Sequence, residues 1–322
     1  MTEYYNPYAG FGGDDRRWLK SQFHMHNLRG DPARGSFTYS MEGMDDFFWD
    51  YKAAGFDVVA HAMHNDMLDT SHLDELVGIR SFNGEEYVDY DGILLVGIKR
   101  GHRGEPQDVI DETNAEGGFA IICHPNQNPA LSELPGIPVL LTKEMSRTLT
   151  GVVGVEIYTG CLSRREMAGV PFGLSLATDY WDEALSSGRL LWGFATDDSH
   201  NGWEMNVGWT DVLSATDDFP AFKSAVVAGA VVASRGMRLY GWSFDGEVLQ
   251  VEADLPYQRA GEAEYRFISD GGVVRATERG RTGSYRLQGD ETYLRVEALN
   301  GDGSILWTQP LLARDRFEVP TV

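Results

Sequence analysis

Hydrophobic and polar residues follow two different patterns along this chain. Over the first 235 residues, short apolar runs rich in branched side chains recur, as is typical of buried β-strands. These runs are FDVVAHA at 56–62, ILLVGI at 93–98, GFAIIC at 118–123, VVGVEIY at 152–158 and LLWGFAT at 190–196. Four other stretches have helical spacing or helix-boundary residues, and they span 41–55, 106–118, 177–188 and 219–230. This part of the chain therefore alternates strands with helices.

Repeated strand–helix–strand units predict an α/β fold with a parallel sheet. Six or seven units over about 215 residues favour a distorted (β/α)7-type barrel. After about residue 235 the alternation has period two, and YLRVEAL places Leu294, Val296 and Ala298 on one face. Hairpin-turn signals such as SDGG and NGDGS recur there. We therefore expect a barrel over 1–235 and a small antiparallel β-sandwich-like domain over 236–322.

The charge of the chain limits its partners. Its 322 residues include 49 Asp and Glu against 27 Lys and Arg, a formal net charge of −22. This balance argues against duplex nucleic acid as a partner, because such binding draws on a basic surface. The opening residues lack a secretory signal, and no apolar run approaches the roughly 18 residues of a membrane span. We expect a cytoplasmic protein without a membrane partner, and the composition leaves its oligomeric state open.

The two cysteines, Cys123 and Cys161, are too few for a disulfide framework. Both lie in or beside apolar runs, so the sequence favours buried free thiols. Cys123 directly precedes His124, which leaves recruitment of this thiol to a metal as an alternative.

The histidines are distributed unevenly. Six of the eight lie at or just after the ends of predicted strands, and these are His24, His26, His61, His64, His124 and His200. In a parallel barrel the carboxyl ends of the strands meet at one mouth, where the chemistry gathers. His24 and His26 are two residues apart, so they can point the same way from a strand end. Asp198 and His200 repeat this spacing.

Carboxylates accompany these histidines at the strand ends, and they are Glu85, Glu86, Glu156, Asp197 and Asp198. Mixed imidazole and carboxylate ligands suit Zn, Mn or Fe rather than a thiolate-rich structural site. More than four such groups at one mouth indicate two or three divalent metal ions that share a carboxylate bridge.

The ordered motifs HMHN, GD, AMHND, NGEE, ICHPN and ATDDSH resemble those of the PHP family, the polymerase and histidinol phosphatase domains. The resemblance spans about residues 20–236 and includes the late VVASRG strand. It implies a distorted barrel of about seven β/α units. It also implies up to three divalent metals and, as in most members, hydrolysis of phosphoesters. The added C-terminal domain is similar to the layout of carbaryl-hydrolase-like members.

The resemblance further implies three metal positions. The first would be held by His24, His26, Glu86 and Asp198. Glu86 would bridge to a second position that His124 also binds. The third, near the substrate phosphate, would be held by Asp31, His64 and His200.

The spacing of the family motifs selects between neighbouring carboxylates. Glu86 stands two residues after Gly84 and is therefore preferred to Glu85 as the bridge. Asp198 stands two residues before a histidine and is preferred to Asp197.

Two departures from the family pattern affect this assignment. Met63 stands where an aspartate often precedes the histidine of the second motif. Gly92 falls where many members carry a histidine ligand of the second metal. Another ligand would then complete that position, from among Asp91, His61, Glu156 and water, or the centre would hold fewer metals.

The predicted reaction is hydrolysis of a small anionic phosphomonoester or phosphodiester by metal-activated hydroxide. The candidate catalytic residues are His64, His200 and Asp31, and either histidine would protonate or orient the leaving group. The sequence contains no P-loop and no GxSxG motif.

Binding of a substrate anion requires basic residues near the strand ends. Arg29 and Arg235 are preferred among the loop arginines, which also include Arg34, Arg103, Arg164 and Arg165. Glu156 is a further candidate for substrate binding, and a place behind the metal ligands is its alternative role. Trp203 and Trp209 either wall the pocket or pack against the C-terminal domain.

Two other functions fit the same residues. The metal site would also serve an amide, carbamate or ester hydrolase, since an activated hydroxide attacks a carbonyl as readily as a phosphorus. Alternatively, the barrel is a non-catalytic metal-binding module.

Overall fold

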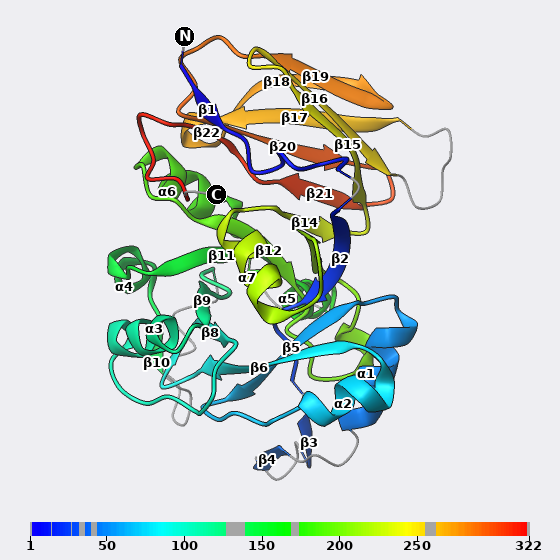
Figure 1. The fold of residues 1–322 in the computed structure, drawn as a ribbon, viewed down its shortest axis with the longest axis vertical. Coiled ribbons are helices and arrows are strands. Elements are labelled where there is room, and N and C mark those ends of the chain that lie inside the picture. The colour runs from blue at the N-terminus through cyan, green and yellow to red at the C-terminus, as the bar shows by residue number, and fades with distance from the viewer. Residues whose placement is uncertain are drawn as a thin grey trace.

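The structure is a computed structural model, and it describes residues 2–13, 15–26, 28–31, 36–39, 44–126, 139–168, 174–254 and 262–320. Side chains at 28–31, 36–39, 90–91 and 139–140 lie outside the described part. Figure 1 shows an α/β part with helices around a mixed sheet, below a part built of antiparallel strands.

The α/β part contains the strands and helices that the apolar runs predict. Its main strands are β2 (Arg17–Gln22), β5 (Val58–His64), β6 (Arg80–Tyr87), β8 (Ile93–Val96), β9 (Phe119–Ile122), β11 (Val152–Thr159), β12 (Trp192–Thr196), β13 (Trp209–Ser214) and β14 (Val231–Arg235). Its short strands are β3 (Leu28–Asp31), β4 (Ser36–Tyr39), β7 (Tyr90–Asp91) and β10 (Val139–Leu140).

The four predicted helices are confirmed as α1 (Met44–Ala53), α3 (Pro106–Ala115), α6 (Thr178–Ser186) and α7 (Phe219–Val227). Three shorter helices were not predicted, and they are α2 (Ser71–Val77), α4 (Lys143–Thr148) and α5 (Gly160–Met167). No helix within the described ranges is long and apolar enough to cross a membrane.

The main strands are not all parallel. Parallel pairing joins β2 to β5 and β5 to β6, and it joins β9 to β11 and β11 to β12. β8 lies between β6 and β9 and is antiparallel to both. The expectation of a parallel sheet is therefore wrong at β8, and also at β13, which is antiparallel to β2 and β14. Residues 88–92 join β6 to β8 without a helix, and a connection this short can join only antiparallel strands.

Hydrogen bonds of one side chain connect β12 to β13. Thr210 Oγ1 accepts a hydrogen bond from Ala195 N at 3.1 Å and donates to Ala195 O at 2.9 Å. Among the described residues, no backbone ladder joins β12 to β13 or β14. Closure of the sheet into a barrel therefore stays a prediction.

The named strands of the C-terminal part pair antiparallel to one another in the part of the chain that the structure describes. Its strands are β15 (Arg238–Phe244), β16 (Val248–Asp254), β17 (Ala263–Ser269), β18 (Val273–Gly280), β19 (Thr282–Arg286), β20 (Tyr293–Leu299), β21 (Ile305–Thr308) and β22 (Leu311–Ala313). β15, β16 and β19 form one sheet, and β17, β18, β20, β21 and β22 belong to another. The apolar core between them contains Leu294, Val296 and Ala298 on one face of β20, as the period-two alternation predicts. This is the expected sandwich-like arrangement.

The two parts share a continuous sheet. β21 pairs with β14, where Ala233 lies opposite Trp307. The N-terminal strand β1 (Tyr4–Tyr5) pairs with β22, so the start of the chain packs with the C-terminal part (Figure 1). The predicted division between 235 and 236 therefore crosses hydrogen-bonded strands, and it stays a prediction.

Apolar packing fixes the position of the chain just after β2. Met25, between the two first histidines, is fully buried and packs in a cluster with Met44, Phe48 and Tyr51 of α1. This burial holds the start of the HMHN motif against the helix.

Lys20 on β2 is a buried cation beside the loop after β12. Its Nζ donates to Ala54 O at 3.0 Å and to Asn206 Oδ1 at 2.7 Å. The ammonium also lies over the rings of Phe56 and Trp209, 4.1 and 4.3 Å from their centroids. Burial lowers the pKa of Lys20 to about 8.

This lowered pKa predicts a pH-dependent stability that Lys20→Met removes. The folded state binds fewer protons than the unfolded state between about pH 8 and pH 10.5, so stability rises with pH over that window. Between these two pH values, the free energy of unfolding of the wild type should increase by about 3 kcal/mol relative to that of Lys20→Met. Urea unfolding of both proteins measures the gain, and a difference that stays constant with pH would contradict it.

Candidate metal centre

Two strand ends lie side by side at the centre. His24 and His26 follow β2, and Asp198 and His200 follow β12. His26 N donates to Ser199 O at 2.8 Å, and Asp198 N donates to His24 O at 2.8 Å. This short parallel pairing interleaves the HxH and DxH motifs. It explains why residues so far apart in the chain face the same space.

Four side chains meet around one point, and we call them the first ligand group: His24, His26, Glu86 and Asp198. His24 Nε2 lies 3.3 Å from Glu86 Oε2 and 3.2 Å from Asp198 Oδ1. His26 Nε2 lies 3.2 Å from each of the same two oxygens. All four side chains are buried.

The bonding of the two imidazoles fits a shared cation. The Nε2 atoms of His24 and His26 are buried and donate no hydrogen bond, although carboxylate oxygens lie close to them. A buried polar atom without a partner costs about 1–3 kcal/mol. That cost disappears when a metal ion accepts the nitrogen lone pair. The residues present therefore fit a divalent metal such as Zn, Mn or Fe.

The two carboxylates of this group are held in their anionic form. Burial opposes ionisation of Glu86, but His24 and His64 outweigh it and hold the pKa well below its usual value. Burial likewise opposes ionisation of Asp198, but His24 and His200 hold its pKa well below its usual value. Burial lowers the pKa of His26. Ionised carboxylates and a neutral imidazole are the forms that bind metals.

Glu86 connects the first ligand group to other donors. Its Oε2, which faces that group, lies 2.8 Å from His64 Nε2. Its Oε1 lies 2.9 Å from His124 Nε2 and 3.8 Å from Cys123 Sγ. A carboxylate that presents one oxygen to each of two sets of donors has the geometry of a bridge between two metals.

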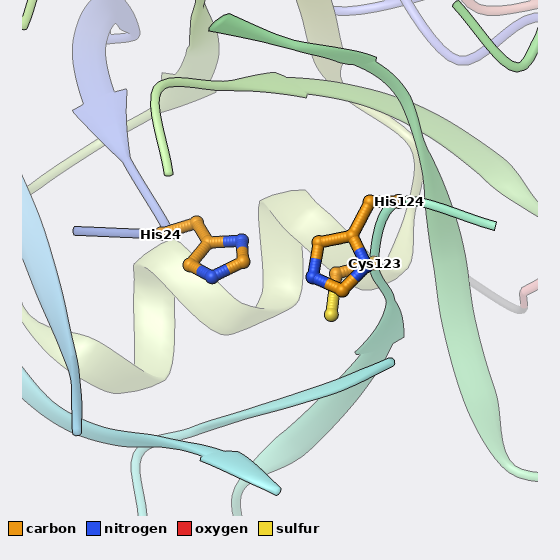
Figure 2. A group of neighbouring side chains, drawn as sticks. All are labelled: His24, Cys123 and His124. Carbon is orange, nitrogen blue, oxygen red and sulfur yellow. The ribbon is translucent and has the colours of Figure 1, made fainter. Parts of the chain in front are cut away.

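The second ligand group consists of His24, Cys123 and His124. One donor atom from each lies within 4.8 Å of the others. Figure 2 shows the imidazoles of His24 and His124 across from each other, with the sulfur of Cys123 beside the His124 ring. The sequence had left Cys123 only as an alternative ligand.

Glu85 faces away from this centre. Its Oε2 accepts a hydrogen bond from His102 N at 2.8 Å, and its Oε1 lies 3.2 Å from Arg103 Nη1. Burial raises the pKa of Glu85 to about 7. Successive side chains of a strand point to opposite faces, so Glu86 and not Glu85 reaches the histidines of the ligand groups.

Asp197 shapes the loop between β12 and β13 instead of joining the ligands. Its Oδ1 accepts hydrogen bonds from Val207 N at 2.7 Å and Gly208 N at 2.9 Å. Its Oδ2 accepts from Asn206 N at 2.8 Å. The structure therefore places Asp198, and not Asp197, beside the HxH motif.

The third ligand group consists of His26, His64 and His200. The ring of His26 lies 4.5 Å from that of His64 and 4.6 Å from that of His200, between centroids. The side chain of His64 is 32% exposed, so this group lies on the open side of the centre. Asp31 and Arg29 lie on β3, and their side chains are outside the described part of the chain.

Glu204 supports His200 and was missed by the sequence reasoning. It lies in the short 3-10 helix η3 (Gly202–Glu204), which has no strand-end signal. Its Oε2 accepts a hydrogen bond from His200 N at 2.8 Å. Its Oε1 lies 3.5 Å from Arg165 Nε. The i, i+4 spacing from His200 was the only sequence signal for this contact.

Glu156 lies behind His24 and does not face open space. Its Oε1 lies 2.8 Å from His24 Nδ1 and accepts a hydrogen bond from Thr196 Oγ1 at 2.7 Å. Its Oε2 accepts from His124 N at 2.9 Å and Thr159 Oγ1 at 3.2 Å. The side chain is fully buried. These contacts favour the alternative role, in which Glu156 orients His24 so that Nε2 faces the ligands.

Residues with a strained backbone conformation cluster at the candidate metal centre. Among the described residues other than glycine, positive φ occurs at Asn65 (52°), His124 (28°), Asp198 (50°) and Asn206 (54°). Each such conformation costs of order 1–3 kcal/mol, and they cluster at functional sites. Two of the four are candidate ligands, and Asn65 directly follows another.

Both cysteines are buried and neither forms a disulfide with a described residue, as predicted, but both also border the centre. Cys161 at the start of α5 donates from its Sγ to Asp198 Oδ2 at 2.8 Å. Asp198 Oδ1 faces the first ligand group. Cys161 therefore supports a candidate ligand from behind.

A small hollow contains two of the candidate arginines. It has a volume of about 200 Å³, and its lining includes Arg164, Trp209, Arg235 and Asp302. The guanidinium of Arg235 lies over the ring of Tyr158, 5.4 Å from its centroid. Neither Arg164 nor Arg235 forms an ion pair with a described carboxylate.

The other described loop arginines are already paired. Arg103 lies beside Glu85, and Arg165 lies beside Glu204. Arg34 lies outside the described residues. Trp209 walls the hollow, whereas Trp203 is exposed and lies beneath the guanidinium of Arg164.

The chain is similar to several solved structures. No family model matches the sequence, and no curated protein matches it. One similar solved structure is described as a two-domain protein from Bacteroides vulgatus ATCC 8482 that contains a predicted PHP-like metal-dependent phosphoesterase. It is 12% identical, with a TM-score of 0.47, and the match covers 92% of this chain and 96% of that chain. The side chains of the centre therefore carry the functional argument.

Proposed function

We propose that this chain is a metal-dependent hydrolase of the PHP type that cleaves phosphoesters of small anionic molecules. The observation that carries this proposal is Glu86, which presents one carboxylate oxygen to each of two sets of buried donors. Seven of the eight candidate ligands lie in the three ligand groups, and they are His24, His26, His64, Glu86, His124, Asp198 and His200. Two or three divalent ions, of Zn, Mn or Fe, suit this set.

The metals would activate a water for attack and neutralise charge on the phosphoryl oxygens. The chain itself positions the ligands and the leaving group. Glu156 holds His24 through Nδ1, and Cys161 holds Asp198 through Oδ2. His64 and His200 lie on the open side, where a leaving oxygen would depart, and either can orient or protonate it.

The hollow at Arg235 suits an anionic part of the substrate. Within the described residues its two guanidiniums form no ion pair, although the net charge of the chain is −22. A guanidinium in a fixed position recognises phosphate or carboxylate through paired hydrogen bonds. We therefore assign Arg235, with Arg164 beside it, to substrate binding.

Arg235→Met is expected to raise KM for an anionic phosphoester by about 10- to 100-fold, because hydrogen bonds to charged groups contribute about 1.5–3 kcal/mol. The kcat should change little, because the hollow is separate from the ligand groups. Arg316→Met removes the same charge from an exposed position and is the matched control. Equal KM values for both variants would contradict the assignment.

A substrate panel tests the proposed reaction. Phosphomonoesters and phosphodiesters should be hydrolysed in the presence of Mn or Zn, and activity should disappear after chelation. Aryl carbamates and anilides belong in the same panel. Turnover of these alone would replace the phosphoester assignment by an amide or carbamate hydrolase. A protein with bound metal and no turnover of any class would favour a metal-binding module.

A further inference from the structure

Gly92, just before β8, cannot carry a side chain in this fold. Its φ is +146°, and a Cβ built there would lie 2.8 Å from the Cβ of Leu141. Carbon atoms this close overlap, so the backbone or Leu141 would have to move. This position therefore supplies no ligand to the centre.

Cys123 lies directly across the sheet from Gly92. Ile93 is opposite Ile122 in the antiparallel ladder of β8 and β9, and Cys123 N donates to Gly92 O at 2.9 Å. Side chains at directly opposed positions of antiparallel strands stand on the same face. Cys123 thus stands opposite Gly92, one residue beyond the end of β9.

The distance from this thiol to Glu86 is close to that between two ligands of one metal, whereas the shorter distance from Glu86 to His124 is that of a hydrogen bond and would widen around an ion. Cys123 Sγ lies 3.8 Å from Glu86 Oε1, and that oxygen lies 2.9 Å from His124 Nε2. Tetrahedral ligands at the usual Zn–N and Zn–S distances lie about 3.4–3.6 Å apart. Cys123 is buried, and so are His24 and His124.

The other cysteine at the centre has a different position. Cys161 Sγ contacts Asp198 Oδ2, the oxygen directed away from the first ligand group. Cys161 belongs to a group of its own with Asp198 and His200, which contains neither Glu86 nor His124. The chain thus offers a second buried thiol at the same centre as a matched comparison.

We infer that Cys123 binds the second metal as a thiolate, together with His124 and Oε1 of Glu86. This inference rests on the proposed metal-dependent function and concerns the second position alone. As the metal–sulfur bond forms, the thiol proton leaves to solvent. Thiolate is a soft ligand, so the second position should select Zn or Fe over Mn or Mg.

Cobalt substitution tests the thiolate ligand independently of activity. The wild-type protein loaded with Co²⁺ should show a sulfur-to-cobalt charge-transfer band in the near ultraviolet. Cys123→Ser should lose the band and bind one metal fewer per chain. Cys161→Ser should keep the band. A band that survives Cys123→Ser, or that disappears only in Cys161→Ser, overturns the assignment.

X-ray absorption at the zinc edge tests whether sulfur binds the metal, without the need for a variant. Wild-type protein loaded with zinc should show a sulfur scatterer at about 2.3 Å in addition to nitrogen and oxygen at about 2.0–2.2 Å. Nitrogen and oxygen alone, in a protein that binds metal and hydrolyses phosphoesters, would refute the thiolate and leave the proposed function intact. A wild-type protein that binds no metal would instead refute the proposed function.

Discussion

Glu86→Gln is expected to empty the centre of at least one metal and to lower phosphoester hydrolysis by about 10³-fold or more. The Glu86 carboxylate contacts four imidazoles, those of His24, His26, His64 and His124. Glutamine keeps the shape but replaces one ligand oxygen by a nitrogen that cannot bind a cation. Loss of a bridged metal removes several kcal/mol of transition-state stabilisation. Each 1.36 kcal/mol corresponds to a factor of about ten in rate.

Glu85→Gln is the matched control, because it makes the same chemical change one residue away on the opposite face of β6. Its partners are the backbone of His102 and the guanidinium of Arg103, and neither belongs to a ligand group. Metal content by elemental analysis and kcat with added Mn or Zn should both be retained. If Glu86→Gln keeps its full metal content, or Glu85→Gln loses it, the bridge is wrongly assigned.

Arg295→Met is expected to destabilise the fold by about 3–5 kcal/mol. Arg295 of β20 donates to Asp182 of α6 through Nε at 2.7 Å and Nη2 at 2.6 Å. Both side chains are almost fully buried, with 3% and 8% of their surface exposed. The substitution leaves the Asp182 carboxylate buried without its countercharge, although Tyr293 still donates to it at 2.8 Å. The pair also joins the α/β part to the C-terminal part, so both should lose stability together.

Denaturant unfolding measures this loss, and the double variant Arg295→Met/Asp182→Leu is its control. Removing both charges together should recover most of the stability, because no unpaired charge then remains buried. Arg279→Met, which breaks an exposed pair with Glu264 on the same sheet, should change stability little. A single variant at Arg295 as stable as Arg279→Met would show that the buried pair does not hold the two parts together.

Most elements of the α/β part follow from local spacing. The apolar runs predicted β5, β8, β9, β11 and β12, because a buried strand needs apolar side chains on both faces. The short helices α2 and α4 escaped prediction, since seven and six residues contain too few turns to show a helical period. The direction of β8 was missed as well, because β6 was not among the apolar runs, and only the short connection from β6 to β8 shows that the two strands are antiparallel.

The candidate ligands could be predicted from residue spacing for a similar reason. In an HxH or DxH motif at a strand end, both side chains can point the same way whatever the rest of the fold does. The structure brings His24, His26 and Asp198 together, and their role as ligands stays a prediction. Glu156, in contrast, has the same strand-end signal but lies behind His24.

Alternation within one segment was therefore enough to propose the two-part fold, the α/β class and a metal centre at the strand ends. Three-dimensional packing was needed to show that Glu86 divides its oxygens between two ligand groups and that Cys123 stands opposite Gly92. It was also needed to place Arg235 and Trp209 in one hollow. The reason is physical: the face on which a side chain stands is a property of its own strand, whereas its neighbours come from segments that only the packed core brings together.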